Sequence, residues 1–277
     1  MRPSTRLPSA GAMLLFSAAA VLPAGGCAGG RTGPPPPPPP PGPPPGGPHN
    51  PRPPAGPGPA SSPVPVLSSG LSLPHRTRHG LIEGEQCEPA ELAPYLTLLR
   101  RELSRYPEKL LRRAGIRRIC VAKRLNFDGR PWTGIPVFEE GVLWLDAVRG
   151  RHVPNYQARL IHHELFHLID KACRGDIRTD PDWASLNPGG FRYGPGGENY
   201  QNTGRDVFAM LDRTGGFLTG YSVSAVEEDK AEVFSCLAVL PAETARRASR
   251  DRVLAAKIEL LRSELERFCP GSAAMLD

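Results

Sequence analysis

The stretch Ile161–Asp170 reads IHHELFHLID and contains three histidines. Side chains at positions i and i+4 share one face of an α-helix. His163 and His167 have that spacing, whereas His162 points about a hundred degrees away from His163 around the helix axis. The pair that can share a metal ion is therefore His163 with His167. Between them, Glu164 completes the pattern H-E-x-x-H, in which the glutamate acts as general base toward a water activated by zinc.

A zinc site of this kind needs a third protein ligand and one open coordination position. The longer pattern H-E-x-x-H-x-x-G-x-x-H does not fit, because Asp170 stands at the glycine position and Cys173 at the third histidine position. The segment 216–237 offers two carboxylates at helical spacing, Glu228 and Glu232, among apolar residues that would bury their helix beside the first. One carboxylate can bind the metal and the other can orient a ligating histidine. Without them, the pentapeptide also fits an ordinary helix that binds no metal.

The first 26 residues have the composition of an export signal. Arg2 and Arg6 precede an apolar, alanine-rich run that is too short for a transmembrane helix, so residues 1–26 are predicted to be removed. The sequence AGGC at the end of this segment, Ala24–Cys27, resembles the bacterial lipoprotein cleavage site, although Ala24 stands where leucine is usual. We expect Cys27 to be lipidated and the protein to be an envelope lipoprotein on the extracytoplasmic side of the outer or cytoplasmic membrane. Without lipidation it would be secreted.

A proline- and glycine-rich segment separates this signal from the part of the chain that can fold. Of the 277 residues, 34 are proline and 30 are glycine, and these two types dominate residues 33–66. Such a sequence favours polyproline II and cannot bury a core. We therefore predict a disordered tether over residues 27–80 and one domain over residues 81–277, with order beginning near Leu81.

Hydrophobic spacing predicts that this domain is α+β. Apolar residues at helical spacing run from Leu92 to Tyr106, where Pro107 ends one helix and opens the next. The remaining pattern predicts strands over 119–125 and 141–147, helices over 155–172, 225–240 and 242–268, and a long loop over 174–204. Trp144 is expected to be a core residue.

The cysteines of the expected domain are Cys87, Cys120, Cys173, Cys236 and Cys269. An exported domain can form up to two disulfides from five cysteines, and the sequence does not give their connectivity. A bond between Cys173 and Cys236 would link the two candidate metal helices, and other pairings fit equally well. None of the five has the C-x-x-C spacing of a structural zinc site.

The net charge of +6 raises the question of a nucleic-acid partner. Basic residues between Arg100 and Arg118 are mixed with Glu102 and Glu108 along an expected helical region, which is typical of a solvated face. No nucleic-acid-binding motif accompanies them. We therefore expect no nucleic acid among the partners.

The two metal-bearing segments together resemble the gluzincin metallopeptidases, and more closely the catalytic domain of the anthrax lethal-factor type. In that family H-E-x-x-H is followed by a tyrosine, six residues, a glutamate and then Ala-Glu. Here Tyr221 precedes Glu228 by seven positions, and Ala231 and Glu232 follow. The loop sequence DPDWASLNPGGFRYG, residues 180–194, is similar to one that exported bacterial zinc peptidases carry between the two helices.

The resemblance implies a zincin-like fold, with a small mixed sheet, the H-E-x-x-H helix and a helical C-terminal half. It also implies the strand 141–147 as the edge of a substrate cleft. The implied site is one Zn²⁺ per chain bound by His163, His167 and Glu228, with Glu164 as general base, Tyr221 as a hydroxyl donor to the developing oxyanion, and Glu232 orienting a ligating histidine.

The implied activity is zinc-dependent hydrolysis of a peptide or protein substrate, by a monomer attached to a membrane through its N-terminal lipid. A second hypothesis keeps the zinc but makes the protein a non-catalytic binding lipoprotein of the envelope, in which Glu164 has no role. A third dispenses with the metal and leaves a structural envelope lipoprotein. The use of a divalent metal other than zinc stays open at this point.

Overall fold

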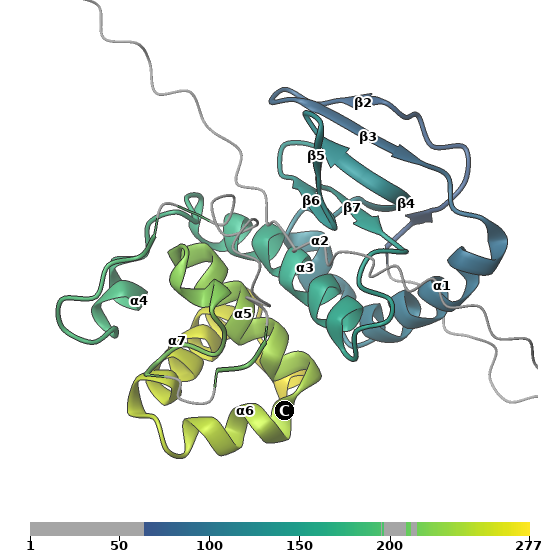
Figure 1. The fold of residues 1–277 in the computed structure, drawn as a ribbon. Coiled ribbons are helices and arrows are strands. Elements are labelled where there is room, and N and C mark those ends of the chain that lie inside the picture. The colour runs from purple at the N-terminus through teal and green to yellow at the C-terminus, as the bar shows by residue number, and fades with distance from the viewer. Residues whose placement is uncertain (1–63, 195, 197–208, 212–214) are drawn as a thin grey trace, which may run out of the picture. The chain divides into compact units, whose positions relative to one another are not determined.

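In the computed structural model, the described part of the chain, residues 64–194, 196, 209–211 and 215–277, combines one mixed β-sheet with seven α-helices (Figure 1). The expected signal sequence, Cys27 and most of the expected tether lie outside these residues. The strands are β1 Val66–Leu67, β2 His75–Arg76, β3 Leu81–Glu85, β4 Arg118–Phe127, β5 Arg130–Pro131, β6 Gly134–Val137 and β7 Val142–Asp146. The helices are α1 Pro89–Leu103, α2 Glu108–Arg113, α3 Tyr156–Arg174, α4 Pro181–Ser185, α5 Val226–Val239, α6 Pro241–Ala248 and α7 Arg252–Phe268, with the 3₁₀ helices η2 Tyr221–Val223 and η3 Ala273–Leu276.

The sheet is organised around its longest strand, β4. In the order β2-β3-β4-β7-β6, β4 pairs antiparallel with β3 and parallel with β7, and β6 completes the row antiparallel to β7. The short strands β1 and β5 pair with the two ends of β4. Among the described strands, β7 therefore has a neighbour on each side, whereas β6 is an edge strand. The expectation that strand 141–147 borders a cleft is wrong, because β6 occupies the edge that β7 would need.

Alternate residues of β4 point into two apolar layers, as the period of a strand requires. Ile119 and Val121 belong to the main core beneath the helices, whereas Cys120 and Ala122 belong to a smaller cluster on the opposite face. That smaller cluster also contains Trp144, which is 3% exposed, so the prediction that it is a core residue is confirmed.

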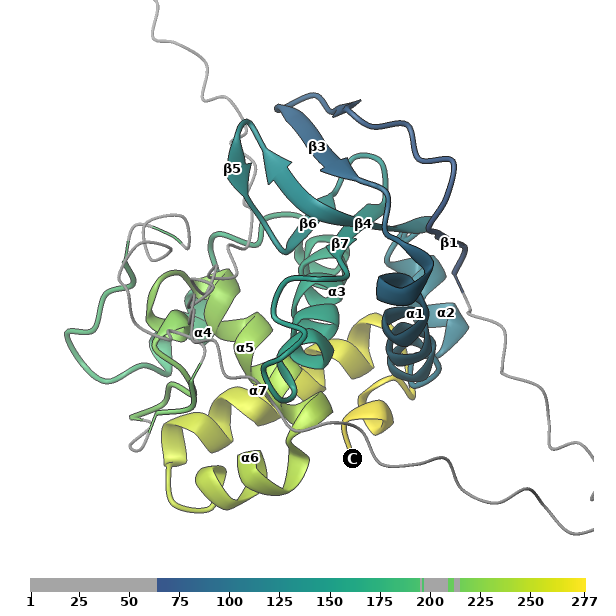
Figure 2. The ribbon, with the colours of Figure 1, turned by 45° about the vertical axis from the view of Figure 1, so that its right-hand side comes forward.

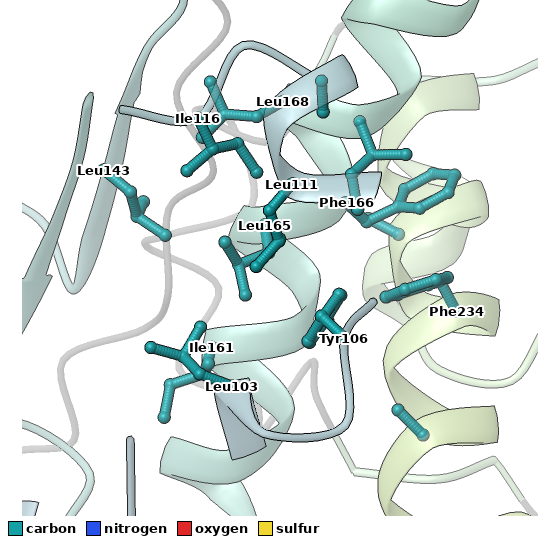
Figure 3. Close-up of a cluster of buried hydrophobic side chains, with 14 of the residues drawn as sticks. Leu103, Tyr106, Leu111, Ile116, Leu143, Ile161, Leu165, Phe166, Leu168 and Phe234 are labelled. Carbon is teal, nitrogen blue, oxygen red and sulfur yellow. The ribbon is translucent and has the colours of Figure 1, made fainter. Parts of the chain in front are cut away.

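Helix α3 lies between the sheet and the C-terminal helices. Figures 1 and 2 show α1, α2 and α3 on the same side of the sheet, with α5, α6 and α7 beyond α3. In Figure 3, Ile161 and Leu165 lie on the side of α3 that faces Leu143 of β7, while Phe166 turns toward Phe234 of α5. The Phe166 and Phe234 rings stack with their centroids 4.7 Å apart. Packing on both sides therefore fixes the helix that carries H-E-x-x-H.

The packed part of the chain begins earlier than Leu81, where the sequence analysis placed its start. Val64 is 3% exposed, and β1 and β2 both precede Leu81. In β1, Val66 pairs with Ile119 and Leu67 with Cys120. Two-residue strands have no measurable periodicity of their own, so the boundary at residue 81 was wrong because pairing with β4, and not the local pattern, orders this segment.

The helix expected over 242–268 is two helices, α6 and α7, separated at Ser249 to Asp251. Asp251 is the N-cap of α7, and its side chain accepts hydrogen bonds from the backbone N–H groups of Val253 and Leu254. The other expected helices and both expected strands are confirmed to within a few residues.

The five cysteines of the folded part are free thiols, so none of the disulfides that the sequence allows, Cys173–Cys236 included, is formed between them. Burial raises the pKa of Cys173 and Cys236 to about 12, and both are held as neutral thiols. No helix in the described ranges is long and apolar enough to cross a membrane.

Candidate metal centre

The candidate centre lies where α3 packs against the first turns of α5. Every residue of α3 from Leu160 to Asp170 is buried. The helix ends at Gly175, whose φ of 79° is readily adopted only by glycine. On α5, Glu228 lies in the first turn and is 1% exposed. The contact between α3 and α5 therefore brings residues 65 positions apart into one site.

Three donor atoms converge at this contact. The Nε2 atom of His163 lies 3.0 Å from Oε2 of Glu228 and 3.1 Å from Nε2 of His167, and the third side, from His167 to Glu228, is 3.5 Å. Ligand atoms placed tetrahedrally at zinc bond lengths lie about 3.3 Å from one another. The triangle therefore has the size and the nitrogen–nitrogen–oxygen composition that fit a zinc ion with one position left open.

The charges at the centre favour a cation. Burial alone would lower the pKa of His163, but its hydrogen bonds to Glu228 and Glu232 outweigh burial and raise it to about 10. Burial alone would raise the pKa of Glu228, but the charge of His167 and the hydrogen bond to His163 lower it to about 2. The carboxylate is thus held ionised, as a metal ligand must be.

Glu232, one helical turn after Glu228, holds the other side of the same imidazole. Its Oε1 atom lies 3.0 Å from Nδ1 of His163, and its Oε2 atom accepts a hydrogen bond of 2.6 Å from Nη2 of Arg159. A proton on Nδ1 leaves Nε2 of His163 free to bind a metal, and a carboxylate partner makes that nitrogen more basic. Sequence reasoning identified Glu232 but not Arg159, which lies one turn before His163.

The predicted general base is next to the histidines and against the sheet. Glu164 is completely buried, and it packs against Gly134, the first residue of β6. A Cβ atom at position 134 would lie 2.4 Å from Cγ of Glu164. The edge strand and the carboxylate are therefore in direct contact.

Tyr221 lies in η2, the 3₁₀ helix that leads into α5. Its side chain is fully buried, and its ring centroid is 6.0 Å from that of His163. The structure therefore brings together five of the predicted site residues of the folded part, at positions 163, 167, 221, 228 and 232, and Glu164 follows His163 on α3 with its side chain against β6. Cys27, the predicted lipidation site, lies outside the described residues.

His162 points away from this centre, as the helix geometry predicts. Its Nδ1 atom lies 2.6 Å from the hydroxyl of Tyr106, and its Nε2 atom lies 3.0 Å from Oε2 of Glu102. His162 thereby connects α3 to Glu102 of α1 and takes no part in the candidate centre.

Two buried lysines follow from no pattern in the sequence. Lys230 is completely buried and donates hydrogen bonds to Asp170 at 2.7 Å and to Asp180 at 2.9 Å. Lys257 of α7 is also completely buried and donates to Asp229 at 2.7 Å. Asp170, a residue of α3 beyond the histidines, is 2% exposed and so does not lie on a solvated face. A lysine three or four positions after Asp170 would have predicted an ion pair within one helix. The actual partner of Asp170, Lys230, lies on another helix.

The loop expected over 174–204 contains α4 and is anchored beside the centre. Asp229, which directly follows Glu228, accepts hydrogen bonds of 2.8 Å from Nε1 of Trp183 and 2.7 Å from the hydroxyl of Tyr193. The backbone N–H of Gly194 donates to the carbonyl of Val223 in η2. The described part of this loop thus packs on the two elements that carry Tyr221 and Glu228.

No protein-family model matches the chain, and no curated protein matches its sequence. Among solved structures, the chain is similar to the crystal structure of a "putative zinc-binding metallo-peptidase" from Bacteroides caccae. The two share 14% sequence identity with a TM-score of 0.48, over 78% of this chain and 83% of that one.

Proposed function

We propose that the protein is a zinc-dependent peptidase of the zincin type, with one zinc ion per chain bound by His163, His167 and Glu228. The observation that carries the proposal is the triangle of three donor atoms, with sides of 3.0, 3.1 and 3.5 Å. Within the described residues, these three side chains form the cluster of histidine and acidic groups that could hold a metal ion. Glu164, between the two histidines in sequence, gives the centre a base.

A zinc ion bound there would supply positive charge that acidifies a water molecule and polarises a carbonyl group. Glu164 takes the proton from the attacking water and delivers it to the amine that leaves. Tyr221 donates a hydrogen bond to the oxyanion as it develops. Glu232, held by Arg159, keeps Nδ1 of His163 protonated and the ring fixed.

The edge strand β6 supports a peptide as the substrate. An extended peptide can add to an unpaired strand edge through backbone hydrogen bonds. Because Gly134 of β6 packs on Glu164, a peptide paired with β6 would pass the general base. This assigns to β6 the role that the sequence analysis gave to strand 141–147.

We also propose that the domain works outside the cytoplasm, as a monomer on a membrane anchor. The support for this is the composition of residues 1–26, which resembles an export signal, and the AGGC ending at Cys27. The proline-rich segment would then separate the catalytic domain from the lipid surface.

The test uses the chain from residue 27 onward, purified with Cys27→Ser. About one equivalent of zinc after dialysis, lost in Glu228→Gln and retained in Glu227→Gln, would support the site, since Glu227 is the neighbouring buried glutamate but is not one of the three donor side chains. A peptide library would then be cleaved by the wild type and not by Glu164→Gln. No zinc in correctly folded protein would overturn the proposal, whereas zinc without hydrolysis would favour the non-catalytic binding lipoprotein.

A further inference from the structure

Gly134 occupies the point at which β6 meets the general base. It pairs with Leu145 of β7 and is buried. A Cβ atom built on it would lie 2.4 Å from Cγ, 2.6 Å from Cδ and 2.8 Å from Oε1 of Glu164, and these are the three atoms nearest to it. All three distances are far inside ordinary van der Waals contact.

The backbone conformation gives no other reason for a glycine here. Gly134 is not among the glycines with positive φ, so any L residue can adopt its backbone angles. Its neighbours in β6 are isoleucine, proline and valine, all buried. The side chain of Glu164 is therefore the obstacle to a side chain at position 134.

Glu164 has little freedom to retreat from such a side chain. It is completely buried, and its helix is packed against the sheet on one side and α5 on the other. A shift of Cγ requires a different side-chain rotamer, which would turn the carboxylate away from its present direction. His163 and His167 project from the same helix but contact Glu228 of α5, so they need not move.

We infer that Gly134 is a positioning residue for Glu164. Because glycine has no side chain, the Glu164 carboxylate can occupy the space beside β6 and is held there. The inference rests on the proposed function for the catalytic meaning of that carboxylate. The contact itself does not depend on the function. Gly134 is also the first residue of the edge strand β6. This one residue therefore sets the separation between the Glu164 carboxylate and a peptide paired with β6.

The contact is tested by a double-mutant cycle in thermal stability, which needs neither metal nor activity. Gly134→Ala in the wild-type background is expected to lower the Tm by about 3 to 10 °C, the range for overpacking in a domain of this size. In the Glu164→Ala background, which removes all three obstructing atoms, the same substitution is expected to leave the Tm nearly unchanged. Gly189→Ala is the control, since nothing lies within 4 Å of its added Cβ. An equal loss in both backgrounds, or failure to fold in both, would overturn the inference.

The positioning role is tested on the zinc-loaded enzyme. Gly134→Ala is expected to keep its zinc affinity within about twofold while kcat falls by about 100-fold, the scale for losing a well-placed proton acceptor. A loss of zinc together with activity would overturn the positioning role and indicate general damage to α3. An inactive wild type with an intact stability cycle would instead count against the proposed function alone.

Discussion

The Nδ1 atom of His163 lies 3.0 Å from Oε1 of Glu232, on the side of the ring opposite to the metal-facing nitrogen. The same carboxylate is paired with Arg159 at 2.6 Å. Arg159, Glu232 and His163 thus form a chain of contacts that ends at the proposed metal position, and each member fixes the next.

Glu232→Gln tests that chain of contacts. The amide has nearly the size of the carboxylate but lacks its charge, so we expect zinc affinity to fall by about 10- to 100-fold. The affinity is measured by competition with a chromogenic chelator. Glu259→Gln, an exposed site on α7, is the control and should bind zinc normally. Unchanged affinity in Glu232→Gln would show that the carboxylate does not tune His163.

Tyr221→Phe tests the oxyanion donor. Loss of one such hydrogen bond costs about 100-fold or more in kcat, and we expect KM and zinc content to stay close to the wild-type values. Steady-state kinetics on a cleaved peptide would measure this. Tyr95→Phe is a matched control, because Tyr95 is also buried and its hydroxyl makes no hydrogen bond within the described residues. If both variants keep full activity, Tyr221 is a core residue.

Glu227 makes the stability of the metal-free protein depend on pH. Burial, with the charge of Glu228, raises the pKa of Glu227 from 4.5 to about 7. Between those values the folded protein binds more protons than the unfolded chain, so stability falls as the pH rises from about 4.5 to about 7. Glu227→Gln should remove this loss and be more stable than the wild type at pH 8, by on the order of 3 kcal/mol, but not at pH 4. Urea unfolding at both pH values measures it, and parallel pH curves would contradict it.

Lys257→Met tests the ion pair with Asp229. Both side chains are completely buried, and burial raises the pKa of Asp229 and lowers that of Lys257, each toward its neutral form. Removing one partner leaves the other charge buried and unpaired, so we expect a loss of about 3 to 5 kcal/mol in the free energy of unfolding. Arg246→Met, which breaks a solvent-exposed pair with Glu243, should have a much smaller effect on the free energy of unfolding. Equal losses in the two variants would be inconsistent with this reasoning.

The sequence was sufficient for the side chains that face the metal position. The spacing of His163 and His167 follows from helix geometry, and the spacing of Tyr221, Glu228 and Glu232 follows from the resemblance. The positions of His163 and His167, and of Glu228 relative to Glu232, are set by the local helical repeat and can be predicted before any tertiary contact is seen, whereas Tyr221 follows from the resemblance alone.

The rest of the site could not be read in this way, because it depends on which elements become neighbours. Gly134 has no helical or strand signal of its own and matters only because β6 packs on α3. Lys230 stands in a run of charged residues, EEDK, that would ordinarily be solvated. It is buried because Asp170 and Asp180 arrive from other elements to neutralise it. The two-residue strands β1 and β2 were missed for the same reason.

The position of α7 also sets when the buried surroundings of Glu228 can be completed during synthesis. Asp229 and Lys230 directly follow Glu228, and both have partners on α7. Lys257 donates a hydrogen bond to Asp229, and Glu264 lies 3.4 Å from Lys230. A ribosome delivers α5 before α7, and until α7 arrives Asp229 lacks the ammonium partner that its burial requires. A nascent or truncated chain that lacks α7 is therefore expected to bind zinc poorly at the proposed centre.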